Sequence, residues 1–89
     1  MKFAVTRLCG GKALMAASSD SMDIDIGKAS KILTDDGFIL KKNEDGLMLI
    51  LEWKDMEVTL YPQGKVMFHP LSDKDLAVEY AAMILEKVG

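Results

Sequence analysis

The sequence predicts a two-layer α+β domain, an antiparallel sheet with two helices on one face, in the element order β-α-β4-α. Two observations lead to this prediction. Four short apolar stretches between residues 38 and 69 are separated by turn residues, as in a meander of strands. Residues 22–36 and 73–88 repeat apolar side chains at helical spacing. Sheets and helices with one apolar face each bury those faces together, which gives two layers.

Length and composition predict one cytoplasmic domain, residues 1–89. Hydrophobic residues make up 49% of the chain, which is enough for a core, and no apolar run approaches the ~20 residues of a membrane span. The single cysteine excludes an intramolecular disulfide framework, and the N-terminal stretch lacks a signal-peptide pattern. The net charge of -3 weakens the case for non-specific nucleic-acid binding, which normally needs a basic face.

The first strand is expected at residues 2–9, where apolar and polar side chains mix, and Gly10-Gly11 ends it. The pattern of residues 12–21 leaves three alternatives open: an extension of the strand, the start of a helix, or a loop. A helix is then expected within residues 22–36, with Asp25 or Ser21 as the N-cap and Gly37 at the left-handed C-terminal position. Its apolar stripe consists of Ile26, Ala29, Ile32 and Leu33.

The next two strands are expected at residues 38–42 and 47–53, joined by a turn that ends in Gly46. A two-residue turn at Lys54-Asp55 then pairs Glu52 with Glu57 and Ile50 with Thr59. This register predicts that Leu47, Leu49, Leu51 and Trp53 face the core. Carried back across the first turn, it places Phe38 and Leu40 on the opposite side, with Met48 and Ile50.

The last hairpin has the clearest turn chemistry, Tyr61-Pro62-Gln63-Gly64-Lys65, with Pro at the first corner and Gly at the left-handed position. This turn pairs Tyr61 with Lys65, and the pairs that follow are Leu60–Val66, Thr59–Met67, Val58–Phe68 and Glu57–His69. Val58, Leu60, Val66 and Phe68 therefore face the core. A closing helix is expected after Pro70, with Ser72 as its N-cap.

The strand, Gly64-Lys65 turn, strand and alanine-rich helix with Tyr80-Ala81 resemble one half-repeat of the TATA-box-binding protein. The specific part of the resemblance covers about thirty residues, and the rest matches in element order. In that family the concave sheet face binds the DNA minor groove with phenylalanine wedges. The resemblance implies that Tyr61 occupies a wedge position, that Thr59, Met67 and His69 face the groove, and that Lys65 follows the turn glycine. The chain departs from the family in having one half, Tyr at the wedge, and Glu52 and Glu57 on the binding face.

The predicted registers collect a large apolar patch on the sheet face that the helices leave uncovered, and such patches usually mark a binding surface. The alternative is that the first helix, a loop or a second copy covers the patch. Its predicted binding residues are Phe38, Leu40, Met48, Ile50, Thr59, Tyr61, Lys65, Met67 and His69.

Three other candidates have simpler structural interpretations. His69 beside Glu57 is a possible acid–base pair, but a surface cross-strand pair is the more common arrangement. The acids Asp20, Asp23 and Asp25 have the oxygen ligands that calcium prefers, but helix capping explains them better. The loop Cys9-Gly10-Gly11-Lys12 lacks the spacing of a phosphate-binding loop, so a strand-ending turn is expected.

The sequence therefore predicts a small, non-enzymatic interaction module without cofactor, metal or catalytic residues. Its expected partner is another protein or a second copy of itself, bound by the uncovered sheet face, with no role for a membrane. The first alternative is nucleic-acid binding of the TATA-box-binding-protein type. The second is a small metal-binding protein or enzyme.

Overall fold

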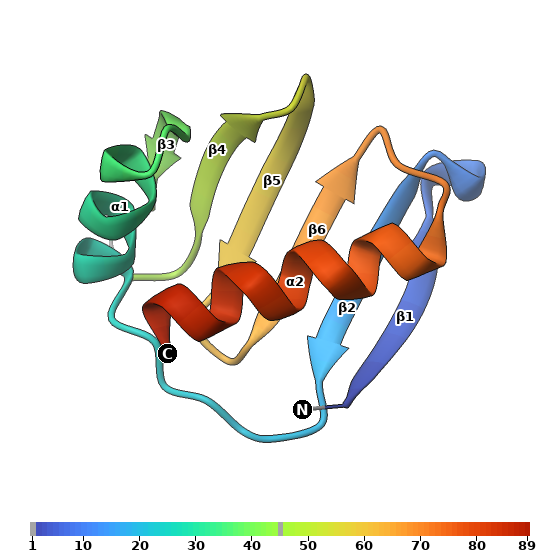
Figure 1. Cartoon of the computed structure of the whole chain (residues 1–89), viewed down its shortest axis with the longest axis horizontal. Helices are drawn as coiled ribbons and strands as arrows, with labels where there is room; N and C mark the ends of the chain where they lie inside the picture. Colours follow the sequence, from blue (N-terminus) through green and yellow to red (C-terminus); the bar gives the residue numbers. More distant parts are fainter. Residues whose placement is uncertain (1, 45) are drawn as a thin grey trace.

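One antiparallel sheet of six strands carries both helices on the same face (Figure 1). The structure, a computed structural model, describes residues 2–44 and 46–89, and for Cys9 only the backbone. The strands are β1 (Phe3–Leu8), β2 (Ala13–Ser18), β3 (Ile39–Asn43), β4 (Leu49–Trp53), β5 (Met56–Tyr61) and β6 (Lys65–His69), and the helices are α1 (Ile26–Asp35) and α2 (Lys74–Val88). The strand order in the sheet is β1-β2-β6-β5-β4-β3. The predicted two-layer α+β fold is confirmed.

The stretch that the sequence left open, residues 12–21, contains a strand, β2. Gly10 and Gly11 both have positive φ angles, 67° and 92°, and let the chain reverse so that β2 returns along β1. The strand β2 then pairs with β6 and joins the first hairpin to the meander. The observed order is therefore β-β-α-β4-α, with one strand more than predicted, and from β2 onward it follows the predicted order.

The predicted registers of the last three strands are confirmed. All five predicted pairs of β5 and β6 are present, from Glu57–His69 to Tyr61–Lys65, and β4 pairs with β5 through Ile50–Thr59 and Glu52–Glu57. Gly64 has φ 99°, and its backbone nitrogen donates to the Tyr61 carbonyl over 3.1 Å, as the predicted turn requires. Lys54 and Asp55 both have positive φ, as in a type I′ turn, whose twist matches that of the two strands it joins.

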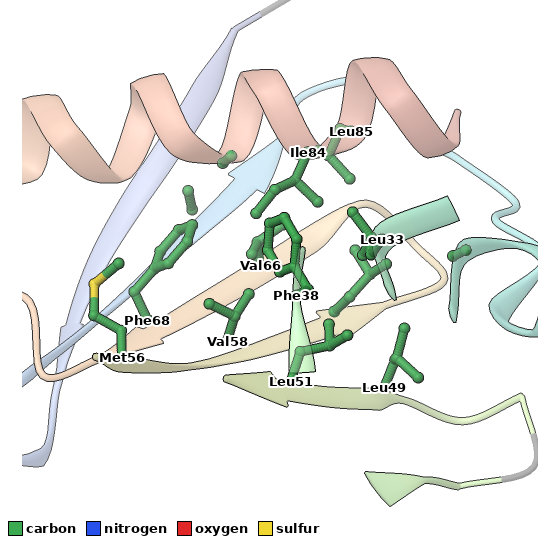
Figure 2. Packing of buried hydrophobic residues seen from close by; sticks show 14 of the residues in the cluster. Leu33, Phe38, Leu49, Leu51, Met56, Val58, Val66, Phe68, Ile84 and Leu85 are labelled. Atoms are coloured by element: carbon green, nitrogen blue, oxygen red, sulfur yellow. The ribbon is translucent and has the colours of Figure 1, made fainter. Parts of the chain in front are cut away.

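The core lies between the sheet and the helices, where alternate strand residues and the inner helix residues meet (Figure 2). Aromatic rings meet within it: Trp53 of β4 stacks on Phe38 at 4.7 Å between ring centroids and meets Tyr80 of α2 edge-on at 4.9 Å. The strand residues of this core cluster are Leu14, Ala16, Leu49, Leu51, Met56, Val58, Leu60, Val66 and Phe68, and its helix residues are Ile26, Ala29, Leu33, Ala77, Ala81, Ile84 and Leu85.

Both helices begin at an aspartate. Asp25 caps α1 as expected, and its side chain accepts a hydrogen bond from the Lys28 backbone nitrogen. The N-cap of α2 is Asp73 and not Ser72, because the Asp73 carboxylate accepts from the backbone nitrogens of Asp75 and Leu76 at 2.9 and 3.2 Å. One side chain of the predicted α1 stripe, Ile32, remains 39% exposed.

Candidate binding face

The sheet face opposite the helices, called here the open face, is organised around one cross-strand row of side chains. Direct register pairs connect its members from one edge strand to the other. Within the described part of the chain, both helices lie on the other side of the sheet (Figure 1), where they pack with the strands around the core cluster. We call these residues the central row: Thr6, Met15, Met67, Thr59, Ile50 and Lys42.

The central row is most buried at its middle and exposed at both ends. Thr59 is only 2% exposed although it lies on the open face, because it is flanked by Met67 and Ile50 on the neighbouring strands. Met15, Met67 and Ile50 are half-buried, and the terminal Thr6 and Lys42 are exposed. An apolar middle with polar ends is the usual make-up of a protein-binding surface.

Charged side chains of opposite sign border the central row. On one side, Glu57 lies between His69 and Glu52 in the register, and its carboxylate pairs with Lys41 at 3.5 Å. On the other side, the exposed Lys65 lies next to the half-buried Tyr61. At the end of the row, a hydrogen bond to Glu44 and the charge of that carboxylate raise the pKa of Lys42 above its usual value.

Two of the predicted face residues lie elsewhere. Phe38 is 3% exposed and belongs to the core, where it stacks on Trp53. Leu40 pairs with Leu51, so it lies on the helix side of the edge strand, 43% exposed. The open face receives Ile39 in their place, opposite Glu52.

An irregularity in β3 explains this error. The register shifts between Leu40 and Lys42, so Lys41 has no direct partner on β4. An extra residue of this kind reverses the facing of every residue before it. The connection after β3 is also longer than predicted, since Asn43 pairs with Leu49, and Leu47 is consequently 70% exposed instead of facing the core.

The other predicted face residues lie together. Ile50, Thr59 and Met67 are in the central row, and Tyr61, Lys65 and His69 lie on the same strands with the same facing. Met48 precedes β4 and is half-buried. Lys42 of the central row was not among the predicted face residues, and neither were Thr6 and Met15, because residues 13–17 have no period-two pattern that would have identified β2. The paired glycines Gly10-Gly11 between two apolar stretches are the signal of a hairpin that would have found them.

The structure gives less support to the predicted acid–base and metal sites. His69 and Glu57 are cross-strand neighbours, but the carboxylate of Glu57 pairs with Lys41. Asp20 and Asp23 are exposed and Asp25 caps α1. No group of three or more histidine, cysteine or acidic side chains that could hold a metal ion occurs among the residues that the structure describes.

The loop after β1 borders a hollow of about 410 Å³ that is lined by Gly11, Lys12, Pro70, Leu71 and Ser72. The Leu71 backbone nitrogen donates to the Lys12 carbonyl over 3.1 Å, so this loop is joined to the connection between β6 and α2. The side chain of Cys9 lies outside the part of the chain that the structure describes. The observed contacts of this loop are therefore structural.

Comparisons with protein-family models, with curated proteins and with solved structures found no match to this chain. The resemblance to a TATA-box-binding-protein half-repeat thus stays a prediction. Neither helix is long and apolar enough to cross a membrane, a finding that covers residues 2–44 and 46–89.

Proposed function

We propose that this chain is a non-enzymatic protein-binding module whose open face binds a partner protein. The observation that supports the proposal most directly is the central row, in which half-buried apolar side chains flank Thr59 while the ends are polar. Completing the burial of Met15, Met67 and Ile50 removes apolar surface from water, which stabilises a complex by roughly 25 cal/mol per Å² before the losses of association are subtracted.

The charges around the row indicate the chemistry of the partner. Glu52 and Glu57 lie on one side and Lys65 on the other. Because Glu57 already pairs with Lys41, a complementary surface has an apolar strip with a basic side chain toward Glu52 and an acidic one toward the lysine. Two carboxylates on the face and a net charge of -3 oppose a nucleic-acid backbone, so a protein is the favoured partner.

A displayed peptide library provides a defined probe for this proposal. Peptides selected on the immobilised protein are synthesised, their dissociation constants are measured by calorimetry, and the perturbed backbone amides are mapped by NMR. We expect the shifts to centre on Met15, Ile50, Thr59 and Met67. Met67→Glu, which places a charge in the middle of the row, is expected to weaken binding about tenfold or more, since an unpaired charge in an apolar interface is unfavourable.

Leu47→Glu is the matched control. It introduces the same charge at another apolar residue, one that is 70% exposed and lies in the connection between β3 and β4, outside the central row, so it should leave the affinity unchanged. Shifts that centre on the helices, or equal weakening by both variants, would refute the proposal. Retardation of duplex DNA in a gel at low salt, lost in Met67→Glu, would instead favour the nucleic-acid alternative.

A further inference from the structure

The two edge strands of the sheet differ in how they are protected against pairing with another strand. Proteins commonly protect an edge with lysines, bulges or short strands. The edge strand β3 has these devices: a register irregularity at Lys41, a second lysine at Lys42, and five exposed residues. The edge strand β1 pairs with β2 through six consecutive residues without an irregularity, and Arg7 is its single charged residue.

Two hydrogen bonds establish which backbone groups of β1 point away from β2. The Ser19 nitrogen donates to the Lys2 carbonyl over 2.8 Å, and the Ser18 nitrogen donates to the Gly64 carbonyl over 2.9 Å. In an antiparallel pair, alternate residues direct both backbone groups to the same neighbour. Ala4, Thr6 and Leu8 therefore bond to β2, and Phe3, Val5 and Arg7 direct their N–H and C=O groups outward.

We propose that β1 pairs with β1 of a second copy, antiparallel across a two-fold axis at Val5. The contact between the two copies consists of the outward backbone groups of Phe3, Val5 and Arg7. This inference does not depend on what binds the open face. With the axis at Val5, all three residues face an outward-directed partner: Val5 faces Val5 of the second copy, and Phe3 faces Arg7. Shifting the axis by one residue leaves fewer outward groups paired.

The side chains support this register. Phe3 and Val5 are half-buried and already pack against the core from the edge of the sheet, and Val5 beside Val5 of the second copy completes their burial. The register also places Phe3 beside Arg7 of the second copy. The Arg7 guanidinium donates to the Ser72 carbonyl of its own chain over 3.5 Å, and an arginine beside an aromatic ring is a favourable pair. The two Arg7 side chains lie four residues apart along the strands, roughly 13 Å, beyond the screening length at physiological salt.

Pairing the other edge strand, β3, with its own copy is unfavourable. Pairing β3 with itself about its middle residue places Lys41 opposite Lys41 of the second copy, and the irregularity there interrupts the ladder. The proposed dimer would instead join the two sheets edge to edge. Ala4 and Thr6 of both copies then lie side by side, and the two open faces form one continuous surface (Figure 1 shows β1 and β3 at opposite sides of the sheet).

The test measures the mass in solution of the whole chain by light scattering and ultracentrifugation. The wild type is expected to be a dimer that dissociates on dilution. Val5→Pro removes an outward N–H while leaving the bonds to β2 in place, as proline is tolerated on edge strands, and should raise the dimer dissociation constant about tenfold or more through the loss of two symmetric hydrogen bonds. Lys41→Pro is the control on the other edge and should leave that constant unchanged.

A cysteine variant tests the register independently of proline's effect on folding. In a Cys9→Ser background, Val5→Cys is expected to form a disulfide-linked dimer on mild oxidation, because the two-fold axis brings its Cα atoms within about 5.5 Å. Leu40→Cys on the other edge should remain unlinked. A wild type that stays monomeric at millimolar concentration, a dimer unaffected by Val5→Pro, or preferential cross-linking of Leu40→Cys would each overturn the proposal.

Discussion

The two faces of the sheet are built from the same strands, yet they follow different rules of composition. On the helix side, Val58, Leu60, Val66 and Phe68 are fully buried. On the open side, their sequence neighbours Glu57, Thr59, Met67 and His69 include a carboxylate and an imidazole. Packing against the helices therefore determines which residues occupy the helix face. The open face combines apolar and charged side chains, and no element among the described residues covers it.

The largest expected effect separates the two faces at adjacent residues of β6. Phe68→Ala removes a fully buried ring from the centre of the core and should reduce the free energy of unfolding by about 3–5 kcal/mol. Met67→Ala, on the open face, should reduce it by less than about 1 kcal/mol, because Met67 is only half-buried. Urea unfolding followed by circular dichroism measures both. Equal losses would mean that the open face is packed as the core is.

The next effect tests the reversed facing of β3. Phe38→Ala breaks the stack on Trp53 and should destabilise the protein by about 3 kcal/mol. Ile39→Ala, at the adjacent residue that is 61% exposed, should change stability by no more than about 0.5 kcal/mol. The same denaturation experiment distinguishes them. A larger loss for Ile39→Ala would restore the register that the sequence predicted.

The success and the failure of the sequence prediction have the same physical origin. Local turn chemistry specifies register. The turn at Gly64 therefore gave all five predicted pairs of β5 and β6, and the turn at Lys54-Asp55 gave the pairs Ile50–Thr59 and Glu52–Glu57. The irregularity at Lys41 has no such local sign. One unpaired residue there was enough to move both Phe38 and Leu40 from the predicted open face to the helix side of the sheet.

The missing part of the candidate site was non-local. The strand β2 is made of small and apolar residues, ALMAAS, whose alternation is too weak to distinguish strand from helix. It becomes a strand because it lies between β1 and β6, with pairs such as Met15–Met67. That contact joins residues more than fifty apart in the chain, and no short window of sequence contains it. Half of the central row was therefore predictable and half was not.

A smaller effect concerns Thr59, the one buried member of the central row. Thr59→Ala removes a methyl group and a hydroxyl from a site that is 2% exposed and lowers strand propensity, so we expect a loss of about 1 kcal/mol in unfolding free energy. Thr6→Ala makes the same change at the exposed end of the same row and should be within about 0.3 kcal/mol of wild type. If both threonines respond alike, burial in the open face is not what distinguishes them.

The smallest expected change in stability comes from the ion pair at the border of the open face. Lys41 and Glu57 are 3.5 Å apart, with side chains 48% and 45% exposed, so solvent screens most of their attraction. A double-mutant cycle with Lys41→Met and Glu57→Gln should give a coupling of about 0.2–1 kcal/mol that falls as salt is added. A coupling well above this range, or one insensitive to salt, would show that the border of the open face is shielded from water in solution. The face would then be covered in the free protein, and the contrast between the two sides of the sheet would no longer hold.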